Sequence, residues 1–344
     1  MFASRARRVV VVGMVLAALP FLVGAGNGNG GVSDAARAEH RRIVDFWTPE
    51  RVARAVPRDF ILDLGSGRFV PAKRPAPPSG DTAIVSGSSW TKGGAIDGAS
   101  GKVLFAMGTS YYVCSATVLD DPDHNGRSLI LTAAHCVFDE STGNFATNWM
   151  FIPDYDAAPA PLTTSGSFCS STLYGCWTPV AMVVHNGYAS AGGFNDQAVL
   201  YDFAVVAVGP GGHDITELET EVIEQAFSFN TVASDGSVTG YAFGYPAQGK
   251  WKGNDLIYCK GPITTDPLNA DLTYRLAGCK LSGGSSGGPW LIGFNETTGS
   301  GTVVSLNSYG YSGVTAMHGP MLNADTESVY SAALSTKEKT LIVP

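Results

Sequence analysis

Beyond Lys102 the chain alternates short apolar runs with turn residues, and this pattern constrains the fold more than any other feature of the sequence. The runs are rich in β-branched and aromatic side chains, which favour strands, and clusters of Gly, Asn, Asp and Pro separate them. Ile215–Phe227 is expected to be the main helix, with a short one near Thr326–Leu334. The expected class is therefore all-β, an antiparallel barrel or sandwich. Strands are expected at Val103–Met107, Tyr111–Leu119, Ser128–Thr132, Pro179–Val184, Phe203–Val208, Val238–Phe243, Leu272–Leu276 and Thr302–Asn307.

The composition agrees with a large apolar core and an acidic surface. Of the 344 residues, 44% are hydrophobic and 15% are charged, enough for one sizeable domain with appendages or for two modest ones. The formal charge of −8 becomes −11 once the three arginines of residues 1–25 are removed. Such a surface repels nucleic acid, so we expect no nucleic-acid partner.

Residues 1–25 have the features of an export signal. Three arginines precede an apolar run, Val9–Val23, and Val23–Ala25 offers small residues for cleavage. A membrane anchor is the alternative, but the run is shorter than the ~20 residues that a spanning helix needs, and Pro20 interrupts it. We expect a secreted, extracellular protein with no membrane contact after the signal is removed.

Residues 26–82 differ in composition from the rest of the chain. Asn27–Gly31 is rich in Gly and Asn, and Ser33–Ala55 carries helix-favouring Ala, Arg and Glu. Pro71–Gly80 is a Pro-rich tether that fits neither helix nor sheet. This segment is interpreted as the pro-peptide of a zymogen or as an N-terminal extension, with a spacer that is never removed as the alternative. The main domain is expected to fill residues 83–344.

The cysteines predict disulfides rather than a metal site. An even number of cysteines behind an export signal indicates disulfides formed in an oxidising compartment. A zinc site is the alternative, but the chain has no CxxC pair. Asp121–Gly126 imitates the start of an EF-hand loop, yet its twelfth position, Thr132, lacks the required Glu, so a hairpin turn is expected. The six cysteines are Cys114, Cys136, Cys169, Cys176, Cys259 and Cys279.

Three short segments together carry the features of a catalytic site. They are Leu131–Cys136 (LTAAHC), Tyr201–Val206 (YDFAVV) and Gly283–Pro289 (GGSSGGP). They resemble the TAAHC, D-[IF]-A and G-D-S-G-G-P segments of the trypsin and chymotrypsin family, in that family's order of His, Asp and Ser. The resemblance covers roughly residues 100–335. It implies two antiparallel six-stranded β-barrels with few short helices and a site in the cleft between the barrels.

The resemblance assigns a role to each of these polar residues. Ser286 is expected to be the nucleophile and His135 its general base, because a serine hydroxyl attacks well at neutral pH only when a base removes its proton. Asp202 is expected to hold the imidazole ring in the useful tautomer. The N–H groups of Gly284 and Ser286 are expected to form the oxyanion hole, where one donor contributes about 3–4 kcal/mol in the transition state. Taken singly, His135 would also suit a core histidine and Ser286 a glycine-rich turn.

Substrate-binding residues follow from the same resemblance. Ser308, Tyr309 and Gly310 are similar to the family's S-W-G strand, where the serine touches the catalytic aspartate and the glycine backbone pairs with substrate. Lys280 stands six residues before the nucleophile, where an aspartate gives trypsin its preference for Arg and Lys. Lys280 and His318 would instead favour an acidic side chain, as in glutamyl endopeptidases. The alternative is that Lys280 simply points to solvent.

The resemblance also implies one disulfide, Cys114–Cys136, which braces the histidine loop in the family. Cys169–Cys176 would then close a short local loop, and Cys259–Cys279 would join the remaining two cysteines. Each such loop stabilises a fold by roughly 2–4 kcal/mol.

Together these residues predict a secreted serine endopeptidase that hydrolyses protein or peptide substrates through an acyl-enzyme. No cofactor and no metal are expected, and we expect a monomer. One alternative is a non-catalytic homologue that binds protein ligands in the same cleft, although such homologues commonly lose one of the three catalytic residues. The other is an esterase that uses the same triad.

One departure from the family pattern concerns activation. The family's aspartate before the nucleophile, which pairs with the new N-terminus after cleavage, is Ser285 here. Ile84–Gly87 (IVSG) is similar to the family's I-V-G-G start, but it follows Ala83 rather than Arg or Lys. Arg42–Val44 (RIV) is a second segment similar to that start, but it lies far too early in the chain. Neither is interpreted as an activation switch. Latency should instead come from the extension covering the cleft or assisting the slow folding of β-barrels.

A catalytic domain with one extra residue before its mature N-terminus should therefore keep its activity. A trypsin-like switch would lose nearly all of it, because the extra residue displaces the ammonium group from the buried ion pair. Peptide hydrolysis, measured beside the correctly cut protein, tests this expectation. Activity at background level in a folded protein would show that it is wrong.

Overall fold

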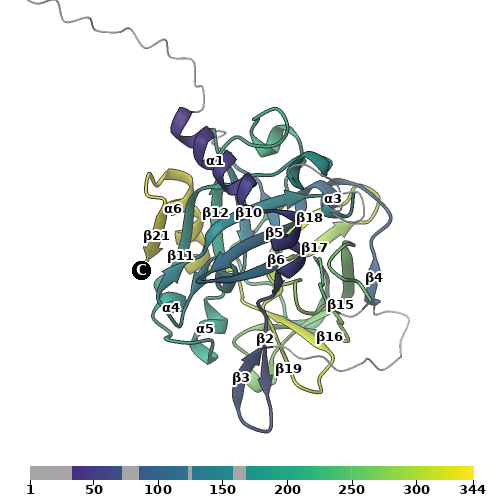
Figure 1. Ribbon diagram of the computed structural model, residues 1–344. Coiled ribbons are helices and arrows are strands. Elements are labelled where there is room, and N and C mark those ends of the chain that lie inside the picture. The colour runs from purple at the N-terminus through teal and green to yellow at the C-terminus, as the bar shows by residue number, and fades with distance from the viewer. Residues whose placement is uncertain (1–32, 72–84, 123–125, 158–167, 249) are drawn as a thin grey trace, which may run out of the picture. The chain divides into compact units, whose positions relative to one another are not determined.

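Strands and tight turns make up most of the structure, a computed structural model that describes residues 33–71, 85–122, 126–157, 168–248 and 250–344. The predicted export signal, the Pro-rich tether after Pro71 and Ile84 lie outside these residues. Two antiparallel barrels, seen side by side in Figure 1, hold the three segments that the sequence analysis singled out.

The first barrel follows the order β10–β5–β6–β7–β12–β11, and neighbouring strands are antiparallel throughout. Reciprocal backbone hydrogen bonds between Phe151 of β10 and Trp177, just before β11, close the ring of six strands. Every residue of β5, β7 and β12 is buried. The strands are β5 (Ser100–Met107), β6 (Ser110–Leu119), β7 (Ser128–Thr132), β10 (Thr147–Pro153), β11 (Pro179–His185) and β12 (Ala204–Val208).

The second barrel follows the order β18–β17–β14–β15–β16–β20–β19. β18 and β19 are two parts of one strand, interrupted at Asn307 and Ser308, so the path returns to its start and again contains six strands. The strands are β14 (Asp235–Gly244), β15 (Ile257–Thr265), β16 (Tyr274–Ala277), β17 (Pro289–Asn295), β18 (Ser300–Leu306), β19 (Tyr309–Tyr311) and β20 (Ala316–Gly319).

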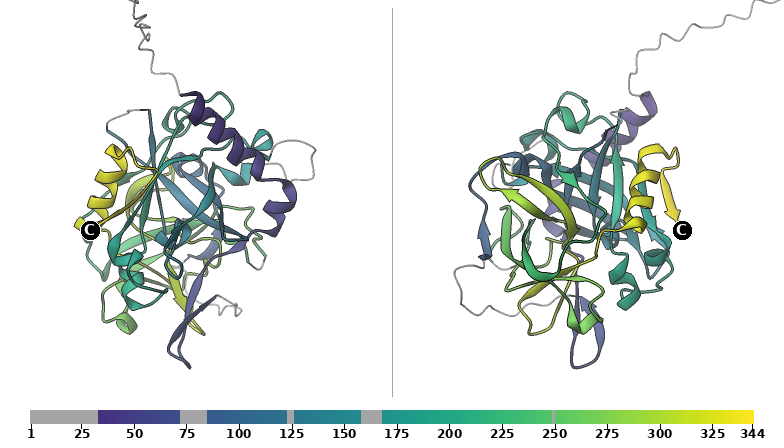
Figure 2. Two further views of the ribbon diagram at one scale, coloured as in Figure 1. Left: turned by 60° about the vertical axis from the view of Figure 1, so that its left-hand side comes forward. Right: turned by 180° about the vertical axis from the view of Figure 1, so that it is seen from behind.

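The predicted fold class, two antiparallel six-stranded barrels with few short helices, is thus confirmed. All of the predicted strands are present, with ends shifted by a few residues. The predicted short helix near Thr326–Leu334 is α6 (Ala324–Ser335), which begins after a capping box at Asn323 and lies against β11 and β12. Figure 2 shows α6 and the C-terminal strand, both yellow, at the outer side of the first barrel.

The predicted helix at Ile215–Phe227 is wrong. This segment contains one 3-10 turn, η4 (Leu218–Thr220), and a two-residue strand, β13 (Ala226–Phe227), which pairs with β18. The buried Gln225 explains the difference, because its backbone N–H bonds to Val118 O and its side chain accepts from Gly301 N. Tertiary pairing at the edge of the barrels therefore outweighs the local helix propensity.

Short elements complete the main domain. β21 pairs in parallel with β11, and β4 pairs with β15. Within the described ranges, no helix combines the length and apolar character needed to cross a membrane. These elements are α3 (Ala95–Ala99), α4 (Asn186–Ala189), α5 (Asp196–Leu200), β4 (Val85–Ser89), β8 (Phe138–Asp139), β9 (Asn144–Phe145) and β21 (Thr340–Val343), with 3-10 turns at Ala134–Cys136, Tyr155–Ala157, Phe168–Ser171 and Pro267–Asn269.

The N-terminal extension, as described here residues 33–71, crosses from the first barrel to the second. Helix α1 (Asp34–Phe46) starts at a Ser33 cap and lies on β10, and α2 (Pro49–Arg54) follows a Thr48 cap. Strand β1 (Val56–Pro57) then pairs with β6 of the first barrel, while β2 (Phe60–Asp63) pairs with β19 of the second. β3 (Arg68–Pro71) forms a hairpin with β2, the purple strands below the barrels in Figure 1.

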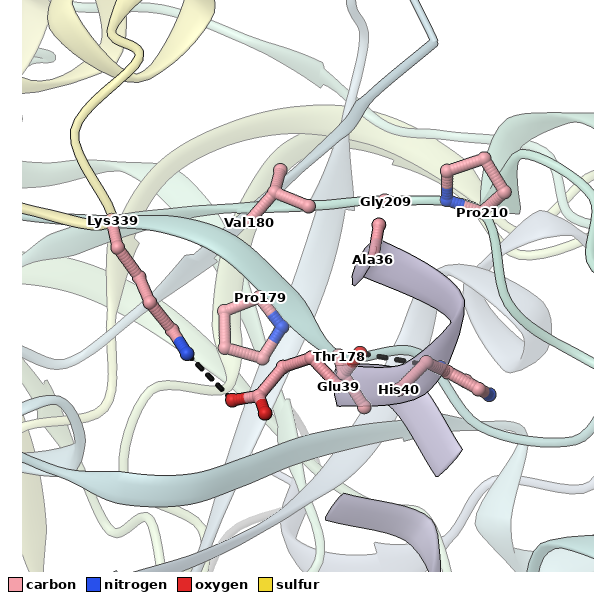
Figure 3. Close-up of a pocket in the computed structure, with 9 residues that line it drawn as sticks. All are labelled: Ala36, Glu39, His40, Thr178, Pro179, Val180, Gly209, Pro210 and Lys339. Carbon is pink, nitrogen blue, oxygen red and sulfur yellow. Dashed lines mark hydrogen bonds and ion pairs between the residues drawn. The ribbon is translucent and has the colours of Figure 1, made fainter. Parts of the chain in front are cut away.

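Polar contacts attach α1 to the rim of the first barrel. Glu39 forms an ion pair of 2.6 Å with Lys339, and His40 Nδ1 lies 3.2 Å from Thr178 Oγ1. Figure 3 shows both contacts at the pocket between α1 and the start of β11. The buried Trp47 donates from Nε1 to Asn148 O at 2.7 Å. The extension is therefore an integrated part of the fold.

Three disulfides join the cysteines, and they are the pairs that the sequence analysis expected: Cys114–Cys136, Cys169–Cys176 and Cys259–Cys279. The first connects β6 to the 3-10 turn that carries His135. The second connects the 3-10 turn Phe168–Ser171 to Cys176, shortly before β11. The third connects β15 to the segment after β16.

One buried cation contrasts with the apolar strand that carries it. Lys102 of β5 is 6% exposed, and its Nζ lies 4.1 Å from the centre of the Tyr155 ring and 3.2 Å from Gly253 O. Burial lowers the pKa of Lys102 to about 8. Between pH about 8 and 10.5, Lys102 is protonated in the unfolded chain but has lost its proton in the folded chain. Folding stability therefore rises with pH across this range.

Lys102→Met should therefore stabilise the protein at pH 7, by up to about 3 kcal/mol, since the shift of the pKa sets the upper limit. The advantage should shrink as the pH approaches 10.5, where the unfolded lysine loses its proton. Chemical unfolding at several pH values measures it. Lys250→Met is the control, because Lys250 is exposed yet also lies over an aromatic ring, that of Trp251. Equal pH dependence for both variants would contradict this account.

Candidate active site

The ladder between β7 and β12 brings His135 and Asp202 together. Thr132 of β7 is paired with Ala204 of β12, so the chain after β7 and the chain before β12 lie at the same end of the ladder. His135 follows β7 within a 3-10 turn, and Asp202 directly precedes Phe203 and β12. Both residues are fully buried.

The Asp202 carboxylate accepts three hydrogen bonds. The backbone N of His135 lies 2.9 Å from Oδ1, and its ring Nδ1 lies 2.8 Å from Oδ2. Ser308 Oγ donates to Oδ2 at 2.5 Å. An ionised carboxylate can only accept, so Nδ1 carries the ring proton and Nε2 presents a lone pair. This is the tautomer that a general base requires.

Glycines shape the loop that carries Ser286. Gly284 has φ +98° and Gly287 has φ +85°, the left-handed region that favours glycine. A Cβ on Gly287 would also collide with Thr132 Oγ1, and one on Gly284 would lie 2.7 Å from Ala247 N. The loop therefore folds tightly against the first barrel at the end of β7, the same end that leads to His135.

Two buried residues that sequence reasoning missed hold this loop. Ser115 of β6 donates from Oγ to Gly284 O at 2.8 Å, and its backbone N donates to Ser286 O at 2.7 Å. Asn307 donates from Nδ2 to Ser285 O at 3.0 Å. The only sequence signals are a serine inside an apolar strand beside Cys114 and an asparagine next to Ser308.

A residue of the extension, Asp59, contacts the serine directly. Ser286 Oγ donates to Asp59 Oδ1 at 2.6 Å, and Gly284 N donates to Oδ2 at 2.9 Å. Among the described residues, His135 Nε2 has no hydrogen-bond partner. Burial raises the pKa of the Asp59 carboxyl, although the hydrogen bonds from Ser286 and Gly284 and the nearby His135 act in the opposite direction. Nothing in the sequence singles out Asp59.

Three of the predicted substrate-binding residues, Ser308, Tyr309 and Gly310, lie on β19 or directly before it, whereas Lys280 lies beside β4. Ser308 contacts Asp202, as described above. Tyr309 and Gly310 pair with Phe60 and Ile61 of the extension, in parallel. Lys280 follows Cys279, and its backbone N donates to Ser86 O of β4 at 2.7 Å.

His318 belongs to a buried cluster behind β19. Its ring stacks on Tyr309 with centroids 5.0 Å apart, and its Nε2 lies 3.9 Å from Asp266 Oδ1. Asp266 also accepts from the hydroxyls of Tyr309 and Tyr311. Burial lowers the pKa of His318 to about 4, so the ring is neutral at neutral pH.

Ser285 is buried, and its Oγ has no hydrogen-bond partner among the described residues. Its backbone N and O bond to Ser282 O and Gly288 N. Val85 is already part of β4, where it pairs with Lys260 of β15. The chain after Ile84 is thus held in a sheet in this form of the protein.

The barrels and the polar residues between them define a protein of the chymotrypsin fold, and comparisons with known proteins agree. The protease Anisep from Arthrobacter nicotinovorans is 30% identical, covers 73% of this chain and 100% of its own, and superposes with a TM-score of 0.59. The thermostable serine protease AL20 from an extremophilic microorganism is 28% identical over 70% of this chain and 99% of its own, with a TM-score of 0.57. The chain therefore belongs to the chymotrypsin-fold serine protease family.

More distant matches agree with this assignment. A Glu endopeptidase is 20% identical over 74% of this chain and 99% of its own, with a TM-score of 0.52, and supports the fold. The family described as lysyl endopeptidase, C-terminal domain, matches residues 80–172. No curated protein sequence matches this chain.

Ser115→Ala should lower kcat about tenfold and leave KM nearly unchanged, because the loss leaves Gly284 O and Tyr245 N unpaired and loosens the loop around the serine. The unpaired groups should also cost about 1–3 kcal/mol of folding stability. Steady-state kinetics of the mature protein and chemical unfolding measure the two effects. Ser110→Ala, at an exposed position of the same strand, is the control. A Ser115→Ala protein with unchanged kcat would refute the positioning role.

Proposed function

We propose that this chain is a secreted serine endopeptidase in which Ser286 is the nucleophile, His135 the general base and Asp202 the group that orients the histidine. The observation that carries the proposal is the buried His135–Asp202 pair beside the glycine-framed Ser286. Membership of the serine protease family supports it.

The geometry suits peptide hydrolysis through an acyl-enzyme. Ser286 Oγ attacks the scissile carbonyl carbon while its proton moves to His135 Nε2. The developing oxyanion accepts hydrogen bonds from the N–H groups of Gly284 and Ser286. His135 then gives its proton to the leaving amine as the C–N bond breaks, and water removes the acyl group by the same steps in reverse. The residues involved need no cofactor.

An extended peptide would pair with the backbone of Tyr309 and Gly310, so we propose protein or peptide substrates. The relatives' names point to different preferences, lysyl and glutamyl. His318 is neutral at neutral pH and supplies no cation to an acidic substrate side chain. This leaves Lys280 as the candidate counter-ion for such a side chain. A peptide library cleaved by the mature protein decides between these preferences.

Maturation is part of the proposal. Residues 1–25 are proposed as the export signal and residues 26–82 as a pro-segment of the domain at 83–344. The described part of that pro-segment lies in the site, with Asp59 on Ser286. A secreted zymogen therefore fits both the sequence and the contacts.

Ser286→Ala should abolish peptide hydrolysis and labelling by a fluorophosphonate probe while the protein still folds. The hydroxyl forms the covalent intermediate, so turnover should fall on the order of 10⁴-fold or more. Peptide and ester assays of matured protein, with the probe, separate an endopeptidase from an esterase or an inactive homologue. Ser285→Ala should be far milder. Normal turnover in folded Ser286→Ala protein would sink the assignment.

A further inference from the structure

The extension occupies the candidate active site in a definite direction. Arg58 lies toward the histidine loop, where its guanidinium donates to His135 O at 2.7 Å. Phe60 to Leu62 pair in parallel with β19. The chain from Arg58 to Leu62 therefore runs from the histidine side of the site to the β19 side.

A cleavable substrate must run in the opposite direction. His135 has to protonate the leaving amine, which belongs to the residue after the scissile carbonyl. The C-terminal part of a substrate therefore lies toward the histidine, and its N-terminal part lies along β19. In the extension the N-terminal residue Arg58 lies toward the histidine and the C-terminal residues Phe60 to Leu62 lie along β19. Its backbone therefore runs in the direction opposite to that of a cleavable substrate.

The group that reaches Ser286 is also chemically inert. Asp59 presents a side-chain carboxylate, from which attack by Ser286 would have no amine to expel. Its two oxygens accept hydrogen bonds from the Ser286 hydroxyl and the Gly284 N–H, two donors that the proposed catalysis requires. His135 Nε2 is correspondingly without a hydrogen-bond partner in the described part of the chain. Asp59 thus disconnects the nucleophile from its base.

Contacts on both sides hold Asp59 in place. Arg58 forms ion pairs with Glu140 at 3.0 Å and with Asp139 at 3.4 Å. Phe60 stacks on Phe194 with centroids 4.1 Å apart and an interplanar angle of 9°. The Phe60 ring also packs edge-to-face against the His135 ring, with centroids 5.7 Å apart, and so covers the histidine. The segment is therefore positioned by charge on one side of Asp59 and by aromatic packing on the other.

We infer that residues 57–62 are a built-in, reverse-oriented inhibitor of this protease, with Asp59 as the group that occupies the nucleophile and the oxyanion site. The inference rests on the proposed function and adds to it the residue and the binding direction that keep the precursor silent. The inference also gives the extension a function of its own. Proteolytic cleavage between residues 71 and 85 would leave residues 57–62 intact, so the released extension could still bind the site.

Protonation of Asp59 adds a pH dependence with a definite sign. Burial raises its pKa in the closed site, where His135, Asp202 and the Ser286 loop face it and Arg58 points away to Glu140 and Asp139. The closed form therefore binds a proton that the open form releases. Inhibition should be tightest at acidic pH and should weaken as the pH rises through the raised pKa.

The test is labelling of the intact, signal-free precursor by a small fluorophosphonate, with the full-length band resolved from the mature band on a gel. The wild-type precursor should react at least about 100-fold more slowly than the mature form. Asp59→Ala should raise the precursor's rate about 10- to 1,000-fold, because two hydrogen bonds to a carboxylate are lost. Asp45→Ala, at an exposed acidic position of α1, should match the wild type. A wild-type precursor as reactive as the mature form, or a silent Asp59→Ala precursor that yields active mature protein, would overturn the inference.

Two further readouts separate this inhibitor from a merely structural segment. The ratio of precursor to mature labelling should rise with pH in the wild type and stay flat in Asp59→Asn, which cannot titrate. Mass spectrometry after prolonged maturation should find no cut between residues 57 and 62, whereas a cut after Asp59 would overturn the reverse orientation. Failure of the proposed function itself looks different, because the mature protein would then neither label nor hydrolyse peptides.

Discussion

The burial of the Asp202 carboxylate between the two barrels is the constraint on which the rest of the site depends. A buried carboxylate is stable only when donors satisfy its oxygens. His135 supplies two donors from the first barrel, and Ser308 supplies one from the second. Losing one partner of such a buried group costs roughly 3–5 kcal/mol. The three contacts therefore fix the barrels relative to each other and fix the histidine tautomer with the same bonds.

The serine is positioned by the same principle, applied to backbone groups. Its loop turns through glycines with positive φ, and such a loop cannot satisfy its own carbonyls in a helix or sheet. Ser115 from the first barrel and Asn307 from the second satisfy them instead. Ser286, the proposed nucleophile, thus lies where hydrogen bonds from both barrels meet. The position of Ser286 is therefore a consequence of completing the buried polar contacts between the two barrels.

Sequence reasoning reached the features that local pattern determines. The strands follow from β-branched runs between turn residues, and short motifs in a fixed order identified the three segments that meet at the candidate site. It failed at Ile215–Phe227, where pairing of Gln225 with β6 and β18 overrides helix propensity. Ser115 and Asp59 act through contacts 169 and 227 positions away along the chain, and no local pattern marks them. Local sequence patterns therefore do not predict which polar groups pair over long distances along the chain.

In the proposed function one set of donors would serve both latency and catalysis, and this links the extension to the serine at position 285, where the family has an aspartate. The hydroxyl of Ser286 and the N–H of Gly284 donate to the Asp59 carboxylate in the described structure. In the proposed enzyme the hydroxyl would instead donate to His135 Nε2, and the N–H would bind the substrate's carbonyl oxygen. While the extension is covalently attached, its effective concentration at the site is high, so moderate contacts suffice to exclude substrate. After a cut the same contacts compete as a separate chain, and dilution weakens them. Activation by separation needs no rearrangement of the Ser286 loop and no buried N-terminal ion pair, so a serine at position 285 is compatible with it.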